Sequence, residues 1–444
     1  MNLAPDRFAG MPATIAGRVA ILRQIELPAF QGICRGENPW KMKSARTHEM
    51  LGKQVLGNRC TSAAAGSYSV IDACKKSARL NPMATSSPET FSPPSTSEHG
   101  STRSLEINRA IERKTRPVFV IGCHRSGTNL LYDTLLSAGG FAFYRGYLPV
   151  YKMLVPRFGS LAIRDNRKRL MDAWVRSKGF RRSGLDAQKL TFKVLDECRT
   201  GGDFIRIVMG QVARSQNADR WAVYDPDNLL HIPRLKAEIP EALFIHIIRD
   251  GRDVALSLRK MGGFRPLFWD REARGLLPTA LYWEWMVGRG RQYGHRFPAD
   301  YIEVHYEELV SDPRAALKKL EQFLDHNLDY DRIQNAGLGR LRESNSSFPE
   351  ERGQGSPVNR WKEKLSSRDL ASIEAMVGEY LEELGYPLSS RPVRKPGFRE
   401  KFMRAFYFSL LTAKLWLKTR TPAGRLASLE ALELSDSVEP TELE

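Results

Sequence analysis

A short loop rich in glycine and hydrogen-bond donors stands between a strand-like run and a helix-like run. It reads Gly122-Cys-His-Arg-Ser-Gly-Thr-Asn129 and directly follows the apolar run 117–121. Its two glycines have the G-x-x-x-x-G spacing of phosphate-binding loops. Backbone N–H groups at a helix start can converge on an anion, and the helix dipole adds to the attraction. We therefore expect this loop to hold a phosphate-like group.

The loop differs from that of nucleoside triphosphatases in the place of its cation. Walker loops continue with Lys-Ser/Thr after the second glycine, and that lysine reaches the β- and γ-phosphates of ATP. Here Thr128 and Asn129 follow Gly127, and the cation lies inside the loop at Arg125. We expect a cradle for one phosphate-like group rather than an ATP site. The alternative is a strand-to-helix turn that binds no ligand.

A second candidate anion site lies where another strand-like run, residues 243–248, passes into a helix. Arg249 follows that run at its carboxyl end, where open α/β sheets bind their ligands. Ser257 comes two helical turns later, so the two side chains can close on one phosphate from two sides. Asp250 or Asp253 can cap the helix start. The alternative is a charged surface cluster around a turn.

Together, the two motifs resemble those of the PAPS-dependent sulfotransferase family. The first is similar to that family's 5′-phosphosulfate loop, and the second to its 3′-phosphate motif. Downstream, residues 301–313 resemble the family's "x-V-x-Y-E-D-L-x-x-D-P" strand segment, and residues 359–365 resemble its "G-R-W-K" segment. The resemblance covers about residues 116–388 and none of 1–105. It is closest to the broad bacterial and carbohydrate- or tyrosyl-type branch, because the small-phenol branch usually carries Lys in the loop.

The resemblance implies transfer of a sulfuryl group from PAPS (3′-phosphoadenosine 5′-phosphosulfate) to a hydroxyl or amine by in-line displacement, with PAP as product. Arg125 would also stabilise the transferred sulfuryl group. Both this group and the departing phosphate carry negative charge, so both need cations and N–H donors around them. No metal is expected. The acceptor, a glycan, a lipid or a small molecule, is not fixed by the sequence. The implied cofactor-binding residues are Arg125, Ser126, Gly127, Thr128, Asn129, Arg249, Ser257, Arg360 and Trp361.

The resemblance does not supply a general base, which removal of the acceptor proton requires. Relatives often offer a glutamate in a "W-x-E-K/C-T-P" segment, where this chain has Val223. Asp225, Asp227 and His124 are the nearest substitutes. We take Asp225 as the candidate base, with a helix cap beside Pro226 as its alternative role. The missing glutamate keeps open a pseudoenzyme that binds PAPS or PAP with little transferase activity. A P-loop kinase is a weaker alternative.

Strand-like runs alternate with helix-like runs across residues 106–388. This alternation predicts a P-loop-like α/β domain of three layers, with a mainly parallel central sheet flanked by helices. The predicted strands are 117–121, 221–224, 243–248 and 301–306, and predicted helices include 129–138, 254–259 and 313–323.

Composition limits the class of protein. The 444 residues include 68 Lys and Arg against 51 Asp and Glu, for a net charge of +17, with 42% hydrophobic residues. These values are typical of a globular chain. No apolar run approaches the roughly 18 residues of a membrane-spanning helix. Five cysteines without C-x-x-C spacing argue against a disulfide scaffold or zinc site and favour a reducing, cytoplasmic location. The sequence contains no basic motif interleaved with aromatic residues, so its positive charge does not indicate nucleic-acid binding.

The two ends of the chain have different character. Residues 1–82 hold 12 basic and 5 acidic residues, and we expect a poorly structured basic extension. It resembles a transit-like leader, or reflects a mis-assigned start with Met83 as the initiator. A disordered Ser/Thr/Pro-rich linker is expected at 83–105, and no secretory signal is visible.

The C-terminal part is expected to be a basic helical appendage at 389–425, followed by an acidic tail at 426–444. Residues 391–425 carry ten basic residues and one acidic residue, with aromatic and leucine side chains at helical spacing. Such a helix can lie on an anionic membrane surface. The alternative is that it packs its aromatic face on the domain and exposes its cations.

Overall fold

The structure is a computed structural model, and it describes residues 113–261, 275–336, 338, 356–389, 397–426, 428, 429 and 432. All of them belong to the compact unit Pro93–Glu444. The basic extension expected at 1–82, the linker expected at 83–105 and most of the acidic tail expected at 426–444 lie outside the described residues.

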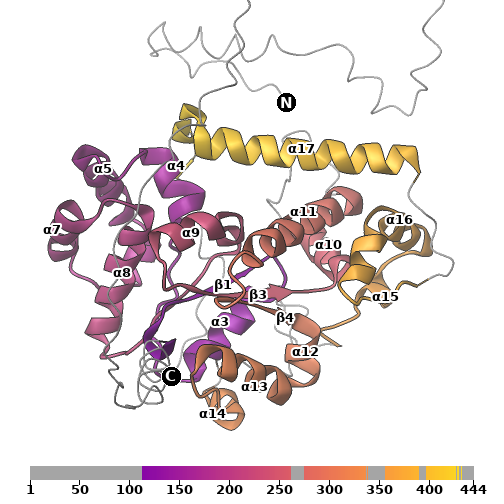
Figure 1. Ribbon diagram of the computed structural model, residues 1–444, viewed down its shortest axis with the longest axis horizontal. Coiled ribbons are helices and arrows are strands. Elements are labelled where there is room, and N and C mark those ends of the chain that lie inside the picture. The colour runs from indigo at the N-terminus through magenta and orange to yellow at the C-terminus, as the bar shows by residue number, and fades with distance from the viewer. Residues whose placement is uncertain are drawn as a thin grey trace, which may run out of the picture. The chain divides into compact units, whose positions relative to one another are not determined.

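Four parallel strands form the central sheet, in the order β2-β1-β3-β4 (Figure 1). They are β1 (Val118–Gly122), β2 (Ala222–Tyr224), β3 (Leu243–Ile248) and β4 (Tyr301–His305). In register, Val118 of β1 lies opposite Ala222 on one side and Leu243 on the other. The predicted fold class and all four predicted strands are confirmed.

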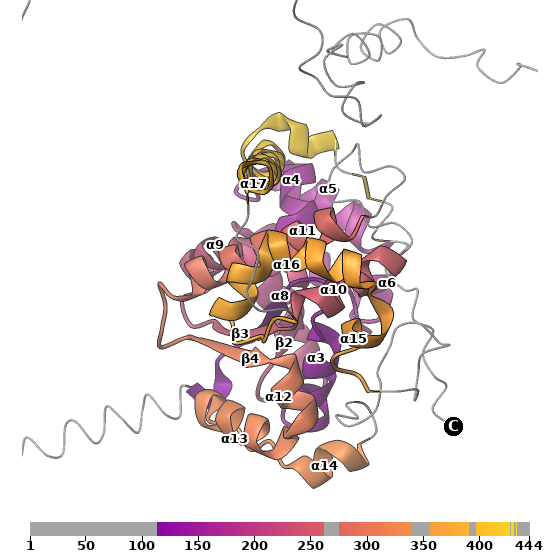
Figure 2. The ribbon, with the colours of Figure 1, turned by 90° about the vertical axis from the view of Figure 1, so that its right-hand side faces the viewer.

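Helices cover both faces of the sheet, as the alternation of side chains along β1 requires. Val118 and Val120 pack into one cluster, and Phe119 and Ile121 into another. Figures 1 and 2 show the two helical layers on opposite sides of the strands. One layer is formed by α3 (Thr128–Ser137), α12 (Tyr306–Ser311), α13 (Pro313–Leu324) and α14 (Tyr330–Asn335). The other contains α8 (Gly201–Ser215), α9 (Ile232–Glu238), α10 (Gly251–Lys260), α11 (Leu276–Gly294) and α16 (Ser367–Glu383).

Shorter helices complete the domain. Those between α3 and α8 are η3 (Val150–Leu154), α4 (Val155–Phe158), α5 (Arg164–Trp174), α6 (Lys178–Arg181) and α7 (Ala187–Glu197). The others are η4 (Pro226–His231), α15 (Trp361–Lys364) and η6 (Pro422–Leu426). Three of these short helices, η3, η4 and α15, carry side chains that lie beside the two anion motifs.

A long helix, α17 (Phe398–Arg420), runs along the outside of the domain beyond α11 (Figure 2). It is the helix expected in the basic appendage. Tyr407, Phe408 and Leu410 pack against the core, and Leu411 is buried. Phe398 is nevertheless 87% exposed. The helix therefore has apolar side chains on two sides, one toward the domain and one away from it. Within the described ranges, no helix combines the length and apolarity needed to cross a membrane.

Candidate active site

The sheet topology brings the two anion motifs together. The chain leaves β1 for β2 on one side and later returns to β3 on the other, so the carboxyl ends of β1 and β3 border a topological switch point, where α/β proteins bind ligands. There Nη1 of Arg249 donates to the carbonyl oxygen of Arg125 at 3.3 Å. Nε of Arg125 donates to Oγ of Ser257 at 2.9 Å. The two motifs that the resemblance assigns to one cofactor therefore lie side by side.

Backbone geometry explains the two glycines of the loop. Gly127 has a φ of 95°, and a Cβ there would lie 2.5 Å from Cδ2 of Tyr306. A Cβ on Gly122 would lie 2.6 Å from the carbonyl oxygen of Ile247. Arg125 also has a positive φ, of 72°. The loop therefore packs tightly against β3 and α12, and a side chain at either glycine would push it out of place.

The start of α3 offers donors to an anion. Oγ of Ser126 is fully buried and has no hydrogen-bond partner among the described residues. Thr128 is buried and Asn129 is exposed, both in the first helical turn. No side chain caps this helix start. Because a buried hydroxyl without a partner is unfavourable, an anion accepting from Ser126 and from the first N–H groups of α3 fits this position.

Arg249 is held at the end of β3 by contacts on several sides. Its guanidinium lies 4.4 Å from the ring centre of Tyr306, and its Nη2 donates to the carbonyl oxygen of Pro357 at 2.8 Å. The carboxylate of Asp253 lies 3.7 Å away. Nε of Arg249 is buried and has no partner within the described part of the chain. The side chain is thus fixed beside the loop with one donor still available.

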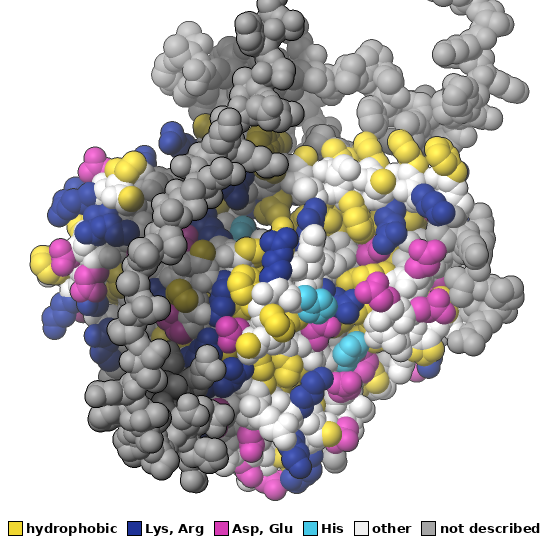
Figure 3. Space-filling model, in the orientation of Figure 1, with side chains coloured by type: hydrophobic (Ala, Val, Ile, Leu, Met, Phe, Trp, Pro, Cys, Tyr) yellow, Lys and Arg dark blue, Asp and Glu magenta, His cyan; other side chains and the backbone are white. Residues whose placement is uncertain are grey.

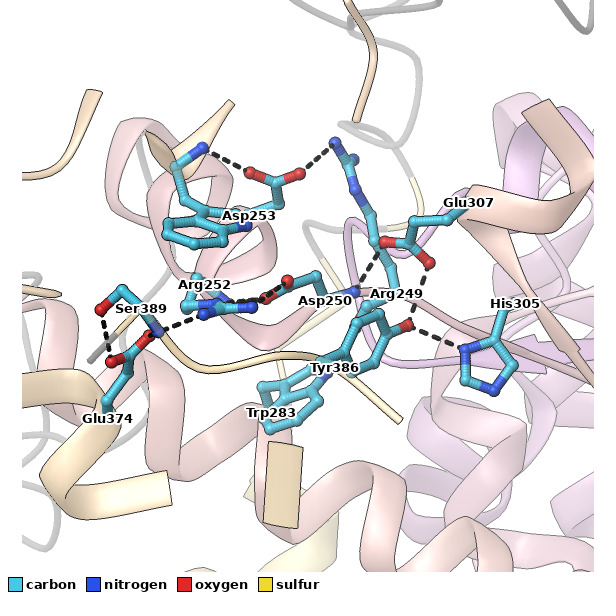
Figure 4. A network of polar contacts seen from close by, with 11 residues as sticks. Arg249, Asp250, Arg252, Asp253, Trp283, His305, Glu307, Glu374, Tyr386 and Ser389 are labelled. Carbon is cyan, nitrogen blue, oxygen red and sulfur yellow. Dashed lines mark hydrogen bonds and ion pairs between the residues drawn. The ribbon is translucent and has the colours of Figure 1, made fainter. Parts of the chain in front are cut away.

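A buried polar network surrounds the backbone that follows the carboxyl end of β3 (Figure 4). Asp250 caps α10, as expected, by accepting from the backbone N–H of Arg252 at 2.9 Å. The fully buried guanidinium of Arg252 bridges Asp250 and Glu374, at 2.7 Å from each. The backbone N–H of Asp250 also donates to Glu307 at 2.9 Å. Burial raises the pKa of Glu307 to about 7.

Truncating Arg252 is expected to destabilise the protein strongly. Arg252→Ala leaves the buried carboxylates of Asp250 and Glu374 without their cation, at an expected cost of about 3–5 kcal/mol in the free energy of unfolding. Urea unfolding of the purified protein measures this loss. Arg259→Ala, which removes an exposed cation from the same helix, is the matched control. A loss as small as that of the control would mean that the network contributes little.

The segment carrying Arg360 and Trp361 lies beside α10. The backbone N–H of Trp361 donates to Asp253 at 2.8 Å. Its ring faces the guanidinium of Arg252 at 3.7 Å, and only 4% of the side chain is exposed. Arg360 is half-buried just before α15. The implied role of Trp361 in cofactor binding stays a prediction, and this packing does not favour stacking of a nucleotide base on its ring because one ring face is already covered.

Three titratable side chains meet next to the loop. Nε2 of His124 lies 3.3 Å from Oδ2 of Asp227, and Nζ of Lys152 lies 2.6 Å from the same oxygen. They come from the loop, η4 and η3. Burial alone would raise the pKa of Asp227, but Lys152 and then His124 outweigh it and hold that pKa well below its usual range. The cluster therefore contains a carboxylate that stays charged and faces an imidazole.

Asp225 caps a helix, which is the alternative to a role as base. Its Oδ1 accepts from the backbone N–H of Asp227 at 3.1 Å and caps η4, with Pro226 in the first turn. Only 1% of Asp225 is exposed. Burial, and then the charge of Asp227, raise its pKa to about 6. The cap is confirmed, whereas the base role of Asp225 stays a prediction.

Sequence reasoning missed Lys152, and it did not pair His124 with Asp227. Nothing in the local pattern around Lys152 marks it, because its importance comes only from where η3 packs. Among the described residues, no three His, Cys, Asp or Glu side chains gather in a way that could hold a metal ion.

Comparison with known proteins gives a family match for part of the chain. Residues 117–330 match the model described as "Sulfotransferase family". No curated protein sequence matches the chain. Among solved structures, the sulfotransferase domain of the Synechococcus PCC 7002 olefin synthase is similar, with 17% identity and a TM-score of 0.39 over 61% of this chain and 95% of that one.

Two further solved structures are similar. Sulfotransferase STF9 from Mycobacterium avium has 17% identity and a TM-score of 0.35, over 66% of this chain and 82% of that one. Mouse sulfotransferase SULT7A1, complexed with PAP, has 13% identity and a TM-score of 0.32, over 67% and 89%. Through residues 117–330, this chain belongs to the sulfotransferase family.

Proposed function

We propose that this protein transfers a sulfuryl group from PAPS to a hydroxyl or amine of an acceptor by in-line displacement. One observation carries the proposal: Arg125, Arg249 and Ser257, from motifs far apart in the sequence, are in direct contact at the carboxyl ends of β1 and β3. A fixed pair of guanidinium groups suits a ligand with two separate anionic groups. PAPS has them at its 3′ and 5′ positions.

The residues of the loop would bind the 5′ end of the cofactor, and those at the start of α10 and within it would bind the 3′ end. Ser126, Gly127, Thr128 and Asn129 would hold the 5′ group through the first turn of α3. Arg249 and Ser257 would hold the 3′-phosphate, with Arg360 beside them. Two buried atoms support this assignment, Oγ of Ser126 and Nε of Arg249. Neither has a hydrogen-bond partner among the described residues. PAPS, when bound, supplies the sulfuryl group, and the guanidinium of Arg125 would stabilise the charge on that group's oxygens.

The cluster of His124, Asp227 and Lys152 supports a general base within reach of the loop. Nε2 of His124 lies 3.3 Å from the charged Asp227, which leaves Nδ1 as the ring atom that can accept the acceptor proton. Lys152 keeps Asp227 ionised and thereby keeps the imidazole oriented. His124 is therefore a better candidate base than Asp225, whose Oδ1 is engaged in capping η4.

Calorimetric titration with PAP and with AMP tests the cofactor assignment. The contacts that Arg249 and Ser257 make to a 3′-phosphate are charge-assisted, so PAP should bind about tenfold to a hundredfold more tightly than AMP. Equal affinities would contradict the assignment of the 3′ site. If neither nucleotide bound, the transferase and the PAPS- or PAP-binding pseudoenzyme proposals would both fail.

Two alternatives remain distinguishable. A pseudoenzyme would bind PAP but form no sulfated product from PAPS and a panel of hydroxyl and amine acceptors under single-turnover conditions. A kinase would bind Mg-ATP, which the absence of the Walker lysine after Gly127 does not favour. The buried free thiols of Cys123 and Cys198 fit the proposal of a reducing, cytoplasmic location.

A further inference from the structure

The side of α17 that faces away from the domain is apolar. Phe398, Phe402, Trp416 and Leu417 are 87%, 63%, 55% and 47% exposed. Phe402 follows Phe398 by about one helical turn and Trp416 follows Phe398 by about five, so the three share one face of the helix. Figure 3 shows hydrophobic side chains along the edge of the molecule where Figure 1 places α17. Exposed large apolar side chains gathered in this way mark an interaction surface.

The opposite side of α17 is already anchored to the domain. Leu411 is buried there. At the edge of this side, one turn before Trp416, Oγ1 of Thr412 accepts from Nε1 of Trp285 at 3.2 Å. Arg404 forms an ion pair with the buried Glu284 of α11. The exposed aromatic residues are therefore not needed to hold the helix in place.

Cations accompany this apolar face and far outnumber the acids of the helix. Arg399, Lys401, Lys414 and Arg420 are exposed on α17, and Glu400 is the single acidic residue of the helix. An amphipathic helix that joins aromatic residues with lysine and arginine is suited to the boundary between lipid headgroups and acyl chains. Near an anionic bilayer surface, each such cation adds to the attraction.

A cationic pocket of about 660 Å³ lies at the C-terminal end of the helix. Its cationic lining residues are Arg199, Arg234, Lys418, Arg420 and Arg425. Glu238 is the one carboxylate among its described lining residues, and it already accepts from Arg234 at 2.7 Å and from Tyr151 at 2.8 Å. Burial lowers the pKa of Lys418. The pocket thus holds an excess of positive charge.

Three of these cations form no ion pair within the described part of the chain, and only the more distant Asp227 and Asp225 attract Lys418. The side chains of Lys418, Arg420 and Arg425 form no hydrogen bond or ion pair there. Arg420 comes about one helical turn after Trp416, so it lies both on the apolar side of α17 and at the pocket. The apolar face and the pocket are therefore continuous, and an anion in the pocket would relieve the repulsion among its cations.

We propose that α17 docks this protein on an anionic membrane, with Phe398, Phe402, Trp416 and Leu417 in the interface and a lipid phosphate in the pocket of Lys418, Arg420 and Arg425. The occupant is a phospholipid with an exposed phosphate group. This inference does not depend on the proposed function, because it requires neither PAPS nor an acceptor.

Vesicle co-sedimentation of the full chain tests the proposal. The protein should pellet with vesicles of phosphatidylcholine that contain phosphatidic acid, far less with phosphatidylcholine alone, and less as salt is raised. The double variant Phe402→Ser with Trp416→Ser should bind at least about tenfold more weakly, because two large aromatic side chains would no longer be buried in the interface. Phe192→Ser, which changes a side chain 75% exposed on α7, is the matched control and should bind normally.

The pocket is tested by a second pair of variants. Arg420→Ala with Arg425→Ala should reduce the preference for phosphatidic acid, whereas Arg176→Ala, an exposed cation elsewhere, should not. Equal pelleting with both kinds of vesicle, or unchanged binding by the serine double variant, would overturn the proposal. So would calorimetric binding of sn-glycerol 3-phosphate without vesicle binding, which would assign the pocket to a soluble phosphate. A concentration-dependent dimer lost in the serine double variant would assign the face to a second copy of the chain.

Discussion

Replacing His124 by glutamine is expected to lower the single-turnover rate of sulfuryl transfer by about 10²–10⁴-fold, the usual contribution of a positioned general base. Glutamine can still reach Asp227 with its amide, so the loop should keep its shape. It cannot accept a proton near neutral pH. The affinity for PAP should therefore change by less than about threefold, because no contact to the cofactor is removed.

Comparing rate with affinity separates a catalytic role from a structural one. Loss of a general base in His124→Gln should lower the rate alone, whereas a displaced loop would also weaken PAP binding. Asp227→Asn should lower the rate as well, because Asp227 orients His124 and is paired with Lys152. His326→Gln is the matched control, since His326 contacts Gly139 away from the cluster. If His124→Gln kept the natural rate while Asp225→Asn lost it, the base would be Asp225 instead.

Most of the candidate cofactor site could be predicted from the sequence, because its residues stand in local patterns that the fold repeats. Arg125 lies in a glycine-spaced loop after one strand, and Arg249 directly follows another. Parallel strands place their carboxyl ends at the same edge, so neighbouring β1 and β3 must bring both arginines together. The cap formed by Asp225 was predictable for the same reason, since Asp-Pro at a helix start is a local signal.

The acid–base cluster could not be predicted, because it is assembled by tertiary packing. Lys152 meets Asp227 only because η3 packs against η4, and no spacing in the chain encodes that contact. For Trp361, the sequence predicted the segment but not its side-chain contacts. Its motif predicts a place near the second anion site, and it lies there, but the buried Arg252 covers one face of its ring. Sequence patterns located these segments without determining what each side chain touches.

The orientation of α17 was also beyond the reach of sequence patterns. Helical spacing of Phe398, Phe402 and Leu410 predicts a helix, but apolar residues occur on more than one side of it. Which side faces the domain depends on partners elsewhere, such as Trp285 for Thr412 and Glu284 for Arg404. The structure turns Leu410 toward the core and leaves Phe398 and Phe402 outside. Amphipathic spacing therefore fixes the helix but not its rotation about its own axis.

Replacing Arg249 by alanine is expected to weaken PAP binding by about tenfold to a hundredfold and to leave AMP binding within about threefold of the natural value. The reason is that PAP carries the 3′-phosphate that this guanidinium would contact, whereas AMP does not. Arg249→Lys should fall between, because an ammonium keeps the charge but not the planar fork of donors. Calorimetric titration of each variant with both nucleotides measures the difference, with Arg259→Ala as the control for removal of a cation from the neighbouring helix.

Arg249 also supports the loop, so the experiment has to distinguish this structural role from contact with the 3′-phosphate. Its guanidinium donates to the carbonyl oxygens of Arg125 and Pro357, so alanine could loosen the 5′ cradle as well. A loosened cradle would weaken both nucleotides equally, since both carry a 5′-phosphate. Only direct contact with the 3′-phosphate produces a loss confined to PAP. Equal losses would therefore reassign Arg249 to holding the loop, and a loss confined to PAP would make it the residue that distinguishes the two nucleotides.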